Sequence, residues 1–89
     1  MSDDKLNDAT NRAVQAEMLS RNEFFKECLD TLELTYYESW KLAQDTASRE
    51  RIWHCLFGLE RLRIHLQQVI NDGKMAALEI QRLTNRVVN

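Results

Sequence analysis

Four side chains of this 89-residue chain are of types that bind metal ions or act as nucleophiles: Cys28, His54, Cys55 and His65. They contain no Cys-x-x-Cys pair, and on a helix the adjacent His54 and Cys55 point about 100° apart. The spacing therefore predicts no metal site. We interpret both thiols as reduced core residues, because a free cysteine on an apolar helix face behaves as a small hydrophobic residue.

The two histidines and one arginine form a polar ridge, defined by His54, Arg61 and His65. Their spacings of seven and eleven return to nearly the same angle of an α-helix, so the three side chains share one face. This ridge suits an acidic partner or a response to pH, although a solvated polar face is the commoner explanation.

Other catalytic patterns are missing from the sequence. The acidic residues are scattered and have basic residues at helical spacing, as in Glu38–Lys41 and Glu79–Arg82. No glycine-rich phosphate loop is present, and the histidines and thiols lie on different predicted faces. The sequence therefore predicts a protein that is not an enzyme and has no cofactor.

Composition favours a single folded all-α domain. Hydrophobic residues make up 44% and charged residues 29%, with 2 glycines and 0 prolines, so helix formers dominate and turn formers are scarce. No apolar run approaches the ~20 residues of a membrane span, and the acidic start differs from a signal peptide. We expect a soluble, cytoplasmic protein that does not bind membranes.

Three helices are expected, the first being a weakly ordered helix over residues 1–19. The second spans residues 22–44 and begins at a capping box, Ser20-Arg21-Asn22-Glu23. An interhelix turn follows at residues 45–48, with Ser48 as the N-cap of the third helix. The two longer helices should form a hairpin whose core is Phe25, Leu29, Leu32, Tyr36, Trp40, Trp53, Leu56 and Leu59.

The third helix should run over residues 49–87, with a weak point or break near Gly73. Its apolar residues alternate steps of three and four, which is the pattern of a coiled-coil seam: Ile52, Cys55, Leu59, Leu62, Leu66, Val69, Gly73, Ala76, Ile80, Leu83 and Val87. The part beyond the hairpin lacks a partner within the chain. The sequence therefore predicts a homo-oligomer interface made of Leu66, Val69, Gly73, Ala76, Ile80, Leu83 and Val87. In the alternative, Gly73 is a hinge at which the tail folds back.

Basic residues accumulate on the last helix, whereas residues 1–47 carry an acidic excess. Nucleic-acid binding is nevertheless disfavoured, since acidic residues are interspersed and the pI is about 5.6. No short recognition helix follows a tight turn. A charged face beside a coiled-coil seam accounts better for these residues.

Three short segments carry a resemblance to a known group of proteins: residues 37–40 (Tyr-Glu-Ser-Trp), residues 49–53 (Arg-Glu-Arg-Ile-Trp) and residues 73–76 (Gly-Lys-Met-Ala), with Leu59 and Leu62 between the last two. Over roughly residues 24–78 the chain resembles small, uncharacterised helical proteins encoded by tailed bacteriophages and prophages. The resemblance implies a phage origin and a role in head or DNA-packaging assembly, in association with phage structural or packaging proteins or with the virion. The alternative function is a small phage regulator that binds nucleic acid or a host protein.

Overall fold

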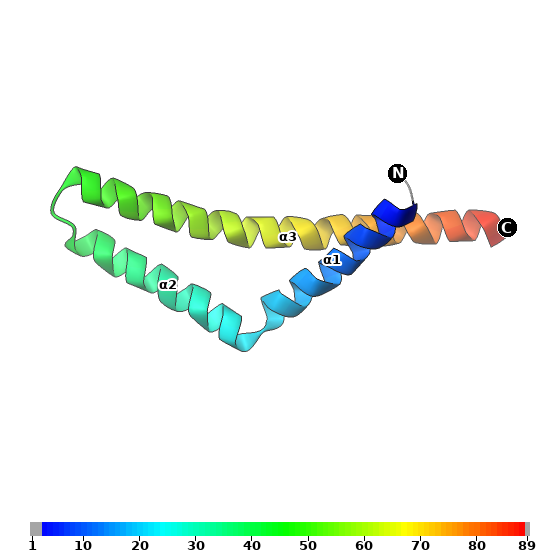
Figure 1. Cartoon of the computed structure of the whole chain (residues 1–89), viewed down its shortest axis with the longest axis horizontal. Coiled ribbons are helices and arrows are strands. Elements are labelled where there is room, and N and C mark those ends of the chain that lie inside the picture. The colour runs from blue at the N-terminus through cyan, green and yellow to red at the C-terminus, as the bar shows by residue number, and fades with distance from the viewer. Residues whose placement is uncertain (1–2, 89) are drawn as a thin grey trace. The chain divides into compact units, whose positions relative to one another are not determined.

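The computed structural model describes residues 3–88, with side chains placed for residues 3–86. Within this range the chain forms three helices and no strand: α1 (Asp3–Arg21), α2 (Glu23–Leu42) and α3 (Thr46–Val88) (Figure 1). The predicted all-α class, with a long C-terminal helix, is confirmed.

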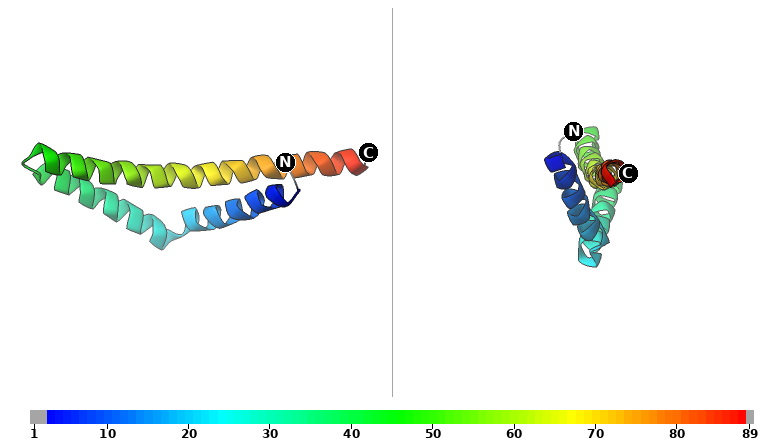
Figure 2. Two further views of the ribbon diagram at one scale, coloured as in Figure 1. Left: turned by 45° about the horizontal axis from the view of Figure 1, so that its top comes forward. Right: turned by 90° about the vertical axis from the view of Figure 1, so that its right-hand side faces the viewer.

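The helices divide into two compact units that share α3. In the hairpin unit, residues 21–64, α2 packs antiparallel to the first part of α3. In the crossing unit, α1 lies along the part of α3 from His65 onward, as Figure 2 shows. Each unit is thus a pair of helices.

The N-terminus of α2 is capped by Asn22. Its side chain accepts a hydrogen bond from the Phe25 N–H at 2.8 Å, and its backbone is extended. Ser20 lies inside α1, so the predicted capping box is wrong. The reason is that α1 continues through Arg21, which leaves the cap to Asn22, a residue type at least as favourable there as serine.

Asp45 caps the start of α3 through a hydrogen bond from the Ser48 N–H to its carboxylate, at 3.0 Å. The helix therefore begins at Thr46, and the prediction of Ser48 as the N-cap is wrong. Across the turn, Arg49 Nε donates to the Ala43 carbonyl at 3.0 Å. The Arg49 side chain, from α3, thus satisfies a backbone carbonyl just after the end of α2.

The Asp45 cap should make stability sensitive to acid. Hydrogen bonds from the Ser48 side chain, and then from its backbone, lower the pKa of Asp45 below its ordinary value of 3.8. Since the folded pKa is lower than the unfolded pKa, the stabilisation is complete above about pH 4 and is lost as the pH falls through the folded pKa. D45N keeps a capping side chain but cannot titrate.

Wild type should therefore lose more thermal stability than D45N between about pH 6 and pH 3, as measured by circular dichroism melting. Equal losses in the two proteins would show that this carboxylate does not stabilise the helix start.

The buried seam of the hairpin unit differs from the predicted one. Leu29, Leu56 and Leu59 are buried, whereas Cys55 is exposed and Leu62 is 41% exposed. The predicted hairpin-core positions Leu29, Leu56 and Leu59 are therefore buried as expected. The coiled-coil seam that was expected to continue through Cys55 and Leu62 is wrong in this unit. Residues 52, 56, 59 and 63 also alternate steps of four and three, and it is this stripe that α2 covers.

Both cysteines are exposed, so the prediction of core thiols is wrong for Cys28 and Cys55. Cys28 directly precedes the buried Leu29, and neighbouring residues on a helix point about 100° apart. Cys55 likewise directly precedes the buried Leu56 and points about 100° away from it. A pair of helices covers only one narrow stripe on each, which leaves both thiols in solvent.

In the crossing unit, α1 approaches α3 closely at Gly73. A Cβ added at this glycine would overlap the Ala13 Cβ and lie 2.9 Å from the Ala9 carbonyl oxygen. Gly73 is buried within α3, which continues without a break, so the predicted weak point is not a helix end. Leu6, Ala13 and Ala16 of α1 and Ile70 and Ala76 of α3 are also buried.

Candidate protein-interaction surface

One side of the hairpin unit carries an aromatic face, defined here as Leu34, Tyr37, Trp53, Phe57 and Ile64. The three aromatic side chains are 46%, 57% and 54% exposed in chain order. They line an open groove of about 250 Å³ together with the buried Leu56 and Leu59. Leu34 and Ile64, at 59% and 43% exposure, share the same side by helical spacing.

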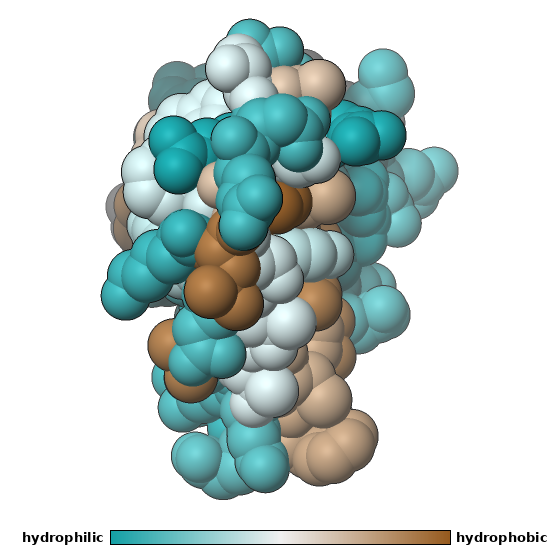
Figure 3. Space-filling view, turned by 90° about the vertical axis from the view of Figure 1, so that its left-hand side faces the viewer, coloured by the Kyte–Doolittle hydropathy of each residue, from teal (hydrophilic) through white to brown (hydrophobic). Residues whose placement is uncertain are grey.

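Apolar side chains at the surface are visible between polar ones in Figure 3, which looks onto the molecule from the side of the α2–α3 turn. Single exposed apolar residues are ordinary, whereas contiguous apolar surface on a soluble protein marks a binding site. The aromatic face is contiguous because three of its members line one groove.

The tryptophans were expected to be buried against the opposite helix, and this prediction is wrong. Trp40 is 40% exposed and Trp53 is 57% exposed. The Arg49 guanidinium covers part of the Trp40 ring, with its carbon 5.6 Å from the ring centroid. Two helices bury one stripe on each, and large side chains beside that stripe stay partly in solvent. Among the other predicted hairpin-core residues, Leu32 is exposed and Phe25 and Tyr36 are half-buried.

Basic and acidic side chains lie at different positions along the aromatic face. Lys41 and Arg49 lie near the turn, whereas Glu33 and Glu60 line the groove. Arg63 donates hydrogen bonds to Asp30 and Glu33, both at 3.2 Å. Within residues 3–86, no ion pair involves Lys41 or Glu60. Lys41 and Arg49 thus lie toward the turn, and the groove itself is lined by two carboxylates. Arg63 compensates the carboxylate of Glu33, and Arg61 lies beside the Phe57 ring.

The predicted oligomer interface on the last helix is partly covered by α1 of the same chain. Gly73 and Ala76 are buried, and Gly73 approaches Ala13 of the same chain. The surface of this glycine is thus occupied by α1 of the same chain. Leu66, Val69, Ile80 and Leu83 are half-buried, and the side chain of Val87 lies outside the described residues.

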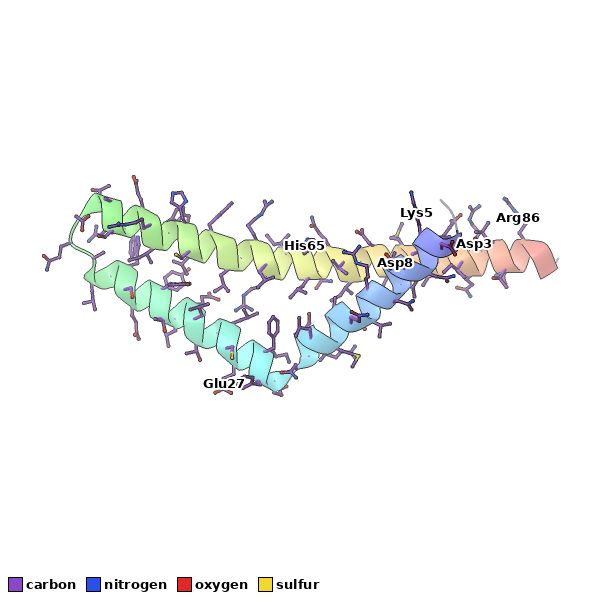
Figure 4. The ribbon with its side chains drawn as sticks, in the orientation of Figure 1. Asp3, Lys5, Asp8, Glu27, His65 and Arg86 are labelled. Atoms are coloured by element: carbon purple, nitrogen blue, oxygen red, sulfur yellow. The ribbon has the colours of Figure 1, made fainter. Side chains whose placement is uncertain are left out.

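A second groove, of about 670 Å³, lies between α1 and α3 in the crossing unit. Its lining mixes charged and apolar side chains, with Lys5, Asp8 and Arg12 from α1 facing Asp72 and Met75 from α3. Lys5 and Asp8 are labelled in Figure 4. This mixture gives the groove no single chemical preference.

The polar ridge residues His54, Arg61 and His65 are all exposed. The Arg61 guanidinium carbon lies 5.9 Å from the centroid of the Phe57 ring. His65 lines a shallow groove with Arg12 and Asp72, and Figure 4 shows it on α3. Across the side chains that the structure places, no three His, Cys, Asp or Glu residues lie close enough to hold a metal ion.

Comparison of the chain with protein-family models, curated proteins and solved structures finds no significant match. No helix among residues 3–88 has the length and apolar character needed to cross a membrane.

Proposed function

We propose that this chain is a non-enzymatic helical protein that self-associates and serves the assembly of a phage virion or its DNA-packaging machinery. Self-association is supported chiefly by the aromatic face, where Tyr37, Trp53 and Phe57 stay about half exposed around one groove. Covering such a surface with protein releases ordered water and is favourable at roughly 25 cal/mol per Å² of apolar area.

Disrupting the aromatic face should produce a monomer. We expect wild type at tens of micromolar to have at least the mass of a dimer in light scattering, and W53D/F57D to have the mass of one chain. Both residues are more than half exposed, so the helical content should stay unchanged. The matched control is F24D/L42D, which alters two side chains that are 72% and 79% exposed and lie outside the groove.

A wild-type protein of monomer mass would refute self-association. Dissociation of F24D/L42D with an intact W53D/F57D oligomer would instead place the interface elsewhere in the hairpin unit. I80D/L83D tests the predicted interface on the last helix in the same measurement.

The assembly role depends on the resemblance to phage proteins and has its own test. The tagged protein, expressed together with the structural and packaging genes of the phage that encodes it, should co-purify with capsid, portal or terminase components. The W53D/F57D variant should not. A salt-sensitive shift of duplex DNA or RNA by the purified chain, without such co-purification, would favour the regulator.

A further inference from the structure

We infer that the aromatic face binds a second copy of this chain in antiparallel orientation, so that Arg49 of one copy faces Glu60 of the other. This inference rests on the proposed self-association and specifies its geometry. It follows from the order of charges along the face and from the position of the groove.

A symmetric pair of hairpins that meet on one face has two simple arrangements. The two-fold axis lies in the interface and runs either along the helices or across them. In the first case the copies are parallel and α2 of one covers α3 of the other. In the second case they are antiparallel and each helix covers its own equivalent.

Charge distinguishes these arrangements. The parallel pair places Glu33 of one copy against Glu60 of the other, and Lys41 against Arg49. Both juxtapositions bring like charges together, which disfavours association. The antiparallel pair places Arg49 against Glu60, so opposite charges meet there. It also places Lys41 against Glu33, whose carboxylate accepts a hydrogen bond from Arg63 of its own chain. Lys41 and Glu60 have no ion-pair partner within residues 3–86, so each is available to a second copy.

The same register brings apolar surface onto apolar surface. If Arg49 faces Glu60, the two-fold axis passes close to residues 54 and 55 of α3. Trp53 of one copy then lies over Leu56 of the other, at the groove that Tyr37 and Phe57 also line. The exposed indole thus meets a groove that aromatic side chains border.

The size of the face is consistent with a stable dimer. An aromatic side chain presents about 150–250 Å², and three that are about half exposed offer roughly 300 Å² in each copy. Two copies would bury roughly 600 Å² of aromatic surface, about half of the ~1,200 Å² at the lower limit of specific interfaces. Leu34, Ile64 and the charged margins supply the remainder.

Cysteine cross-linking can test the orientation. The native thiols are exposed, so C28S/C55S is a suitable background. In that background, R49C is mixed with E60C, oxidised under mild conditions, and resolved by non-reducing electrophoresis and mass spectrometry. A mixture of E33C and E60C reports the parallel arrangement. R51C mixed with E60C is the matched control, because Arg51 lies at the same end of α3 but two residues from Arg49, about 200° around the helix and so on nearly the opposite side.

We expect the R49C–E60C heterodimer to form at least tenfold faster than the R51C–E60C product, and at least tenfold faster than the E33C–E60C product. A dominant E33C–E60C product would overturn the antiparallel orientation. A dimer mass without any of these products would also overturn it, while leaving self-association intact. A monomer mass of the C28S/C55S protein and of wild type would refute self-association itself.

A reversal of charge gives a second readout without new thiols. E60K should weaken the dimer about tenfold, because it opposes Arg49 of the other copy, and R49E/E60K should recover most of the loss. If E60K leaves the dissociation constant unchanged in low salt, Glu60 does not lie in the interface.

Discussion

G73A should destabilise the protein, whereas G58A should stabilise it, although both replace glycine by alanine within α3. At Gly58 an added Cβ meets nothing within 4 Å, so the substitution gains helix propensity, about 0.8–1 kcal/mol. At Gly73 the added Cβ would overlap the Ala13 Cβ and crowd the Ala9 carbonyl. Overpacking of this kind costs about 1–3 kcal/mol, which exceeds the gain in propensity.

Urea denaturation followed by circular dichroism measures both effects. The double variant A13G/G73A is a sharper test, because it removes the Ala13 Cβ that the new methyl group would overlap. The double variant should lose less unfolding free energy than the sum of the losses of A13G and G73A. The Ala9 carbonyl, which the new methyl group still crowds, keeps the loss from disappearing. If G73A is as stable as G58A, α1 does not approach α3 as closely as the structure shows.

L59A should cost about 2–5 kcal/mol of unfolding free energy, near the lower end for a core of two helices, whereas L62A should cost less than about 1 kcal/mol. The two leucines are three residues apart on α3 and undergo the same chemical change. Leu59 is 8% exposed and Leu62 is 41% exposed. The difference between the variants therefore measures burial rather than helix propensity.

Thermal or urea unfolding of the two variants at the same protein concentration provides the comparison. Equal destabilisation would favour the seam expected from the sequence, in which both leucines are buried. A large loss for L62A alone would mean that its side chain is covered in the assembled protein.

The helices were predictable because they depend on local signals. The lack of proline, the apolar periodicity and the single gap near Asp45 gave all three helices to within a few residues at their ends. The caps were less predictable. Ser20, Asn22, Asp45 and Ser48 can all cap a helix, and the choice among them depends on where the preceding chain stops being helical.

Tertiary packing decided what the sequence left open. Leu56 of the predicted hairpin core and Cys55 of the predicted coiled-coil seam belong to two overlapping stripes of α3, and periodicity alone cannot tell which stripe α2 covers. The exposure of Trp53 was missed because size and hydropathy favour burial, while a pair of helices has little surface with which to bury it. Small residues of α1 looked weak as a core, yet Ala13 fits against Gly73 because neither side chain keeps the backbones apart.

The contact between Ala13 and Gly73 also affects how the chain folds. The hairpin joins α2 and α3 through a connection of three residues, so its contacts are local and can form quickly. The contact of α1 with α3 closes a loop that contains most of the chain. The entropy lost on closing a loop grows with the logarithm of its length. Docking of α1 consequently carries the larger ordering cost, and we expect this contact to form late in the folding reaction.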